Sequence, residues 1–136
     1  MGTISPRRTL IRNFGLVLLM VLLPVALVFG AADGNWLKKV PGRDHEKISP
    51  YQGQPDAIAA GRRIFVDRCS QCHGEAGEGT KKRPGLKSKR VQEQATEGDL
   101  HWLLVNGNMR KGMPSWAKLP DQQLWQVITY VKSLHE

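Results

Sequence analysis

Apolar residues recur with a spacing near 3.6 in three segments of the C-terminal half of the chain, and this period predicts helices. The first segment opens at Pro55 and runs into Cys69. A glycine inside it, Gly61, costs about 1 kcal/mol relative to alanine, which suggests that another backbone approaches closely at that point.

The second and third segments carry recognisable start and stop signals. Thr96, with Asp99 three positions later, forms a capping-box pattern before an apolar run that stops at Gly107. The third helix is predicted to begin after Pro120. Its apolar stripe consists of Leu124, Val127, Ile128, Val131 and Leu134, with Trp125 and Tyr130 beside it.

A fourth apolar stretch, from Phe14 to Ala32, has 19 residues without a charge and would extend over roughly 28 Å as a helix, close to the hydrocarbon thickness of a bilayer. Three arginines precede it, and its last three residues are small enough for a signal peptidase. Residues 1–32 are therefore predicted to be a signal peptide or an N-terminal membrane anchor. In both cases the rest of the chain lies on the periplasmic side of an inner membrane.

Residues 33–54 are polar and irregular, and they contain several prolines and glycines. One interpretation is a flexible linker with an end-to-end distance of roughly 25 Å, in which His45 is a solvated loop histidine. The other interpretation is that Trp36 and Tyr51 pack this segment onto the domain. The folded domain is predicted to cover residues 55–136.

The size and composition of the domain favour an all-α fold whose apolar core is completed by a buried prosthetic group. Its 82 residues are expected to supply an apolar core worth only about 3–5 kcal/mol, and too few strand-like runs are present for a β-sandwich. Beyond Ala32 the chain has 17 basic and 12 acidic residues, but it shows no nucleic-acid module. Six basic residues between positions 81 and 90 suggest a solvated loop, or a surface that docks an acidic redox partner or anionic lipid.

The two cysteines of the chain occur in Cys69-Ser70-Gln71-Cys72-His73, the C-x-x-C-H arrangement that attaches a c-type haem. Thiols three positions apart reach two vinyl groups on one porphyrin edge, and the adjacent imidazole reaches the iron. Three alternatives compete with this interpretation. They are a thioredoxin-like redox pair, which needs a preceding strand, a structural zinc site completed by His45, His101 or His135, and a buried or disulfide-bonded cysteine pair.

Iron bound by His73 needs either a second protein ligand or an open sixth position. Met113 is the preferred candidate, because a thioether stabilises ferrous iron and Gly112-Met113-Pro114 is a constrained loop between two predicted helices. Met109, His101 and the absence of any protein ligand are the remaining possibilities.

Residues Gly61 to Leu134 resemble the class I c-type cytochromes. The residues that carry the resemblance are Gly61, Phe65, Cys69, Cys72, His73, Pro84, Leu86, Met113, Pro114 and Tyr130. It implies a small all-α fold of three or more helices wrapped around one covalent haem, held through two thioethers and ligated by His73 and Met113. It also implies that the Pro84 carbonyl accepts a hydrogen bond from His73. The basic residues at 81–90 vary within the family, so the resemblance assigns them no role.

The expected function is one-electron transfer between a donor and an acceptor protein on the periplasmic side of the membrane, with membrane contact through residues 14–32 if these are retained. No acid–base pair or nucleophile accompanies the motif, so the chain is not expected to be an enzyme. Two alternatives stay open. One is a haem sensor or peroxidase-like enzyme with a free sixth site, and the other is a cytochrome subunit fixed in a respiratory or photosynthetic complex.

Overall fold

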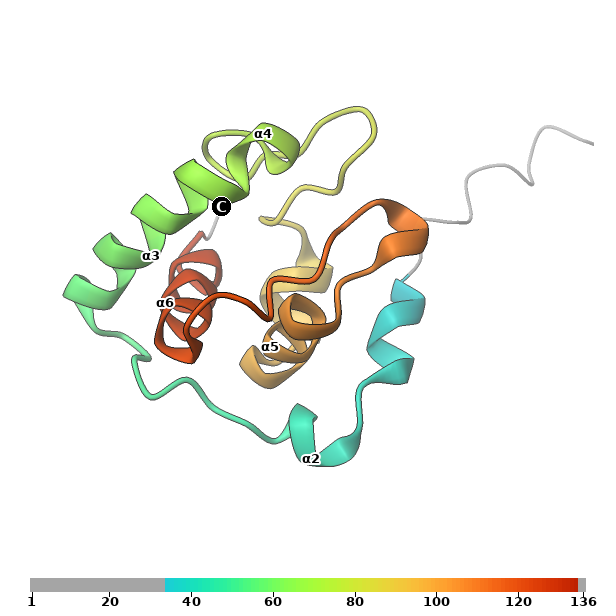
Figure 1. The fold of residues 1–136 in the computed structure, drawn as a ribbon, viewed down its shortest axis with the longest axis horizontal. Coiled ribbons are helices and arrows are strands. Elements are labelled where there is room, and N and C mark those ends of the chain that lie inside the picture. The colour runs from blue at the N-terminus through green and yellow to red at the C-terminus, as the bar shows by residue number, and fades with distance from the viewer. Residues whose placement is uncertain (1–33, 135–136) are drawn as a thin grey trace, which may run out of the picture. The chain divides into compact units, whose positions relative to one another are not determined.

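The computed structural model describes residues 34–134, and every regular element in that range is helical. In chain order the elements are η1 (Gly34–Lys39), α2 (Gly42–His45), α3 (Pro55–Arg68), α4 (Ser70–His73), the π-helix η2 (Arg90–Gln94), α5 (Glu97–Asn106), η3 (Met109–Lys111) and α6 (Asp121–Lys132) (Figure 1). Within residues 34–134, β pairing is limited to isolated bridges. The all-α prediction is confirmed.

The predicted signal peptide or anchor, residues 1–32 with the apolar run 14–32, lies outside the described residues and stays a prediction. Among the helices of residues 34–134, none has both the length and the apolar character needed to cross a bilayer.

Helices α3 and α6 cross and pack against each other (Figure 1). Phe65 of α3 is fully buried against Tyr130 of α6, with ring centroids 5.3 Å apart. At the crossing, a Cβ atom on Gly61 would lie 2.0 Å from the backbone oxygen of Gln126 and 2.9 Å from Cβ of Tyr130. The close backbone approach predicted at Gly61 is therefore confirmed.

Gly61→Ala is expected to lower the free energy of unfolding by about 3 kcal/mol, because the added methyl group forces the two helix backbones apart. Gly42→Ala is the matched control, since a Cβ atom there meets nothing within 4 Å, and its effect should stay within about 0.5 kcal/mol. Urea unfolding of the two holoprotein variants measures both values. Equal stabilities would show that the crossing tolerates a wider separation.

Helix α5 begins and ends where the sequence predicts. The Thr96 side chain accepts a hydrogen bond from the Asp99 backbone N–H at 3.1 Å, and the Asp99 carboxylate accepts one from the Thr96 backbone N–H at 2.8 Å. After Asn106 the chain turns at Gly107, whose φ of 69° is favourable only for glycine. Both predicted boundary signals are confirmed.

Helix α6 buries a wider face than its predicted stripe. The buried residues are Leu124, Trp125, Val127, Ile128, Thr129 and Tyr130, whereas Val131 and Leu134 are only partly buried. Trp125 and Tyr130, predicted to lie beside the stripe, are thus part of the core. Neighbours on both sides of α6 explain the difference, because η2 and α5 cover one side while α3 covers the other.

The segment predicted as a flexible linker, from Gly34 to Gln54, is instead part of the same compact unit as the domain. Trp36 and Tyr51 pack against the apolar cluster that contains Trp125. The linker prediction is wrong for these residues, and the alternative, in which Trp36 and Tyr51 pack onto the domain, is confirmed. Aromatic side chains placed between turn residues provide apolar surface that a solvated linker would leave exposed.

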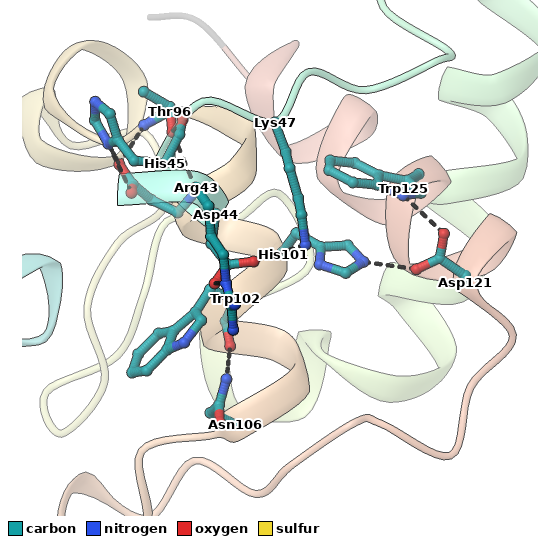
Figure 2. A network of polar contacts seen from close by, with 11 residues as sticks. Arg43, Asp44, His45, Lys47, Thr96, His101, Trp102, Asn106, Asp121 and Trp125 are labelled. Carbon is teal, nitrogen blue, oxygen red and sulfur yellow. Dashed lines mark hydrogen bonds and ion pairs between the residues drawn. The ribbon is translucent and has the colours of Figure 1, made fainter. Parts of the chain in front are cut away.

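Polar contacts also hold this segment to α5 (Figure 2). The backbone N–H of Ser49 donates to the Glu97 carboxylate at 2.9 Å, and His45 Nδ1 lies 2.9 Å from a carboxylate oxygen of the buried Asp99. A Cβ atom on Gly98 would lie 1.9 Å from the Asp44 carbonyl oxygen, so only glycine permits this approach. His45, predicted as a solvated loop histidine, is half-exposed and takes part in this anchoring.

Lys132, in the last turn of α6, closes the C-terminal end of the π-helix η2. Its ammonium group donates to the carbonyl oxygens of Val91 at 3.1 Å, Gln92 at 2.6 Å and Ala95 at 3.0 Å. Desolvation by burial lowers the pKa of Lys132, partly offset by the carboxylates of Glu97 and Asp99. The side chain therefore satisfies helix-end carbonyls that would otherwise lack a donor.

Lys132→Met is expected to lower the free energy of unfolding by about 1–2 kcal/mol, because three carbonyl groups lose a common donor. Lys89→Met removes the same charge from an exposed side chain whose partner is Glu93, and it should change stability by less than about 0.5 kcal/mol. Thermal unfolding of the holoproteins compares the two. A Lys132 variant as stable as the Lys89 variant would contradict this capping role.

Candidate functional site

The C-x-x-C-H residues lie at the junction of α3 and α4. The sequence predicts that one helix delivers the motif, but α3 ends at Arg68 and the one-turn helix α4 begins at Ser70, with Cys69 between them at φ −118° and ψ −31°. Helical hydrogen bonding nevertheless continues through the junction. Cys69 N–H donates to the Phe65 carbonyl at 2.8 Å, and His73 N–H donates to the Cys69 carbonyl at 3.0 Å. Both thiols and the imidazole consequently come from a single helical turn.

The His73 ring is oriented by the chain that follows it. Its Nδ1 lies 3.0 Å from the Pro84 carbonyl oxygen, which is the contact that the family resemblance implies. Because a carbonyl oxygen only accepts, Nδ1 carries the proton of the neutral imidazole, and in that form Nε2 keeps its lone pair. Among the contacts of residues 34–134, Nε2 has no hydrogen-bond partner, so it is the nitrogen that can bind a metal ion.

The loop from Gly74 to Leu86 fixes the position of Pro84. Gly79 N–H donates to the His73 carbonyl at 2.6 Å, and Leu86 N–H donates to the Gly77 carbonyl at 2.7 Å. A Cβ atom on Gly79 would lie 2.5 Å from the Gly85 nitrogen. This close packing leaves the Pro84 carbonyl little freedom to move away from the imidazole.

Met113 lies in a second closed loop, which follows α5. Asn108 and Met113 form an antiparallel bridge, with the Asn108 N–H donating at 2.8 Å and the Met113 N–H donating at 3.1 Å. Between them η3 ends at Gly112, which has the left-handed conformation with φ 71°. The Trp116 N–H donates to the Leu104 carbonyl at 2.8 Å, which ties the loop back to α5.

The two alternative sixth ligands are placed differently. Met109 is 73% exposed on η3, where its side chain points into solvent. His101 is engaged elsewhere, since its Nε2 lies 2.7 Å from an Asp121 carboxylate oxygen and its ring stacks on Trp125 at a centroid distance of 4.2 Å (Figure 2). Met113 is half-buried, and both its backbone N–H and its carbonyl oxygen are hydrogen-bonded to Asn108.

The Asp121 contacts are a feature that sequence reasoning missed. The second carboxylate oxygen of Asp121 accepts from Trp125 Nε1 at 2.9 Å, so one carboxylate joins the start of α6 to α5 (Figure 2). The spacing of Asp121 and Trp125, one helical turn apart, was a readable signal. The contact between His101 and Asp121 left no such signal in the sequence, because it depends on how α5 packs against α6.

The surroundings of the cysteines argue against the other C-x-x-C chemistries. Both thiols are free, which excludes the disulfide alternative for this structure. Burial raises the pKa of the Cys69 thiol to about 11, with a smaller contribution from Cys72, whereas redox-active pairs have a lowered pKa. No strand precedes the motif within the described range, and no three His, Cys, Asp or Glu side chains there converge on a metal position.

The second half of α5 has the character expected beside a flat apolar group. The first residues of the helix, Glu97 to Leu100, are buried by protein. The next turn is apolar but only partly buried, and it consists of Trp102, Leu103, Leu104 and Val105. An apolar helical turn that its own chain covers only in part, and that is tied to the Met113 loop by the Trp116–Leu104 hydrogen bond, suits the porphyrin ring of a haem. The residues of the site therefore fit covalently attached haem c.

Comparison with known proteins agrees with this site. Residues 56–131 match the family described as cytochrome c oxidase, cbb3-type, subunit III. A thiosulfate dehydrogenase of Stutzerimonas stutzeri (strain A1501) is 28% identical over 113 residues, 79% of this chain and 35% of that protein. The Cbb3-type cytochrome c oxidase subunit CcoP of Rubrivivax gelatinosus is 30% identical over 81 residues, 59% of this chain and 27% of that protein.

The chain thus spans about a third of the length of these curated relatives. No solved structure matches the chain significantly. The matched range contains the C-x-x-C-H motif, Pro84 and Met113.

Proposed function

Since this chain belongs to the family of cytochrome c oxidase, cbb3-type, subunit III, and is a c-type cytochrome, we propose that it is a one-electron carrier of the class I type with a single haem c. A bound haem supplies reversible exchange of one electron between ferric and ferrous iron. The observation that carries the proposal is the His73 ring, placed beside two free thiols and fixed in one tautomer by Pro84.

Each group of the site has a defined task in this proposal. Cys69 and Cys72 would hold the haem through two thioethers, and Nε2 of His73 would be one ligand of its iron. Met113 provides a neutral sulfur ligand from a closed loop, which favours the ferrous state and keeps the coordination constant in both oxidation states. The apolar turn from Trp102 to Val105 excludes water from the site.

We further propose that the chain performs no catalytic step of its own. Two protein ligands leave no iron position for a substrate, which separates this function from that of a haem sensor or a peroxidase-like enzyme. The closed loop that holds Met113 supports this assignment. Peroxide consumption by the native holoprotein at the rate of a peroxidase would contradict it.

The donor and acceptor are proposed to be redox proteins on the periplasmic side of the membrane, reached by the chain through its export signal or anchor. Lys81, Lys82 and Lys89 are exposed and form part of a basic segment that suits an acidic docking face. If such docking occurs, the donor protein should reduce the carrier more slowly at high ionic strength, because salt screens the attraction between the two surfaces.

A fixed subunit of an oxidase is the second candidate, and the description of the matched family favours it. A tagged full-length chain isolated from solubilised membranes of its source distinguishes the two candidates. Recovery with stoichiometric oxidase subunits supports a permanent subunit, whereas recovery alone supports a diffusing carrier.

An optical redox titration of the full-length holoprotein tests the proposed function. The expected result is one reversible transition that follows the Nernst equation for a single electron, because the iron is the one redox centre of the proposal. A chromophore that does not respond to potential, or a transition of more than one electron, would contradict the proposal.

A further inference from the structure

Arg83 comes immediately before Pro84, and its backbone is part of the loop that orients His73. The Thr80 N–H donates to the Arg83 carbonyl at 3.0 Å, and the Arg83 N–H donates to the Thr80 carbonyl at 3.2 Å. This pair of hydrogen bonds closes a tight turn of basic residues directly ahead of Pro84. The position from which the Arg83 side chain extends is therefore fixed by the same loop that fixes the imidazole.

The Arg83 side chain reaches the other loop of the site. Its Nη1 donates to the carbonyl oxygen of Lys111, two residues before Met113. The guanidinium group also lies over Gly112, where a Cβ atom would be 2.8 Å from Nη2 and 2.9 Å from Nη1 of Arg83. Two independent features, a hydrogen bond and a glycine that makes room, thus place the guanidinium against the backbone next to Met113.

We propose that Arg83 is a positioning residue for the sixth ligand: it ties the Met113 loop to the His73 loop and so holds the methionine sulfur on the iron. The inference rests on the proposed role of Met113 as axial ligand. Loss of the tie would let the Met113 loop open more often, because the link between this loop and the His73 loop would be lost while the Asn108–Met113 bridge and the Trp116–Leu104 hydrogen bond remained.

The local charges indicate that this contact is specific rather than a general electrostatic attraction. Arg110 and Lys111 are exposed on η3, and Lys81 and Lys82 are exposed beside Arg83. Because both loops are basic, they repel each other, and electrostatic attraction between their net charges cannot explain why they lie close together. A guanidinium group that donates to a backbone carbonyl overcomes this repulsion locally, because a charged donor forms a stronger hydrogen bond than a neutral one.

Imidazole competes with a weakly held methionine ligand, so its binding to the ferric holoprotein measures how often the Met113 loop opens. The experiment titrates native, Arg83→Gln and Lys82→Gln holoproteins with imidazole and follows the iron–methionine absorption at ~695 nm. Lys82→Gln is the matched control, because it removes the same charge from the neighbouring exposed residue, which contacts the Thr80 hydroxyl through its backbone N–H.

Arg83→Gln is expected to bind imidazole roughly tenfold more tightly than the native protein, the size of change that follows from losing one charge-assisted hydrogen bond. Lys82→Gln should bind imidazole with nearly native affinity. Equal affinities for the two variants would overturn the role of Arg83 while leaving the proposed function intact. A native protein that lacks the band would overturn both.

A measurement on the native protein keeps the inference testable if Arg83→Gln fails to fold. Nuclear magnetic resonance of the ferrous holoprotein should show a nuclear Overhauser effect between the Arg83 guanidinium protons and the α-protons of Gly112. Detection of this effect supports the contact in the loaded protein. Its absence, with both resonances assigned, would overturn the proposal.

Discussion

Cys69→Ala/Cys72→Ala protein should lose nearly all of its haem after denaturing electrophoresis, whereas the native chain should keep a haem-stained band at its own mass. Free thiols on one helical turn are the groups from which two thioethers form, and the chain has no other cysteine. The double variant should also be less stable, because a small apolar core no longer gains a permanently attached partner.

Ser70→Ala is the control for this experiment. Ser70 lies on the same turn, but its hydroxyl donates to the Val66 carbonyl and has no part in the proposed attachment. The Ser70 variant should stain like the native protein, and each single cysteine variant should keep some stain through its remaining thioether. A double variant that still holds haem covalently would show that another residue attaches it.

Met113→Ala is expected to abolish the ~695 nm absorption of the ferric protein and to lower its reduction potential by on the order of 0.2 V, within the wide range that axial ligands set. The loss of a neutral thioether removes the preference for ferrous iron. The variant should also bind carbon monoxide when reduced. Optical spectroscopy and a redox titration of the purified holoprotein measure all three changes.

Met109→Ala is the matched control, because it truncates the same type of side chain four residues earlier in the same loop. Its side chain is exposed, so the absorption band and the potential should stay close to native values. A result in which Met109→Ala loses the band and Met113→Ala keeps it would assign the sixth ligand to Met109.

Local signals in the sequence predicted the main helices because each depends on neighbours along the chain. The Thr96–Asp99 capping box and the stop at Gly107 are contacts over a few residues, and both are present. Gly61 predicted a close approach because its entropic cost requires a compensating packing reason. The C-x-x-C-H motif likewise places its three side chains on one turn through local geometry alone.

The remaining features depend on contacts between distant residues. His45 meets Asp99 across 54 positions, and Arg83 meets Lys111 across 28 positions, so neither contact leaves a periodic trace in the sequence. Prolines and glycines in residues 33–54 predicted a flexible linker, but two aromatic rings and buried hydrogen bonds hold the segment to the domain. Tertiary burial outweighed local turn chemistry there.

Carbon monoxide binding to the reduced native holoprotein tests whether the iron has a free position, since an electron carrier with two protein ligands has none. If His73 and Met113 are both ligands, as proposed, adding carbon monoxide should leave the ferrous spectrum unchanged over minutes. Rapid formation of a carbon monoxide complex by the native protein would rule out the proposed ligation and would favour a sensor or a peroxidase-like enzyme.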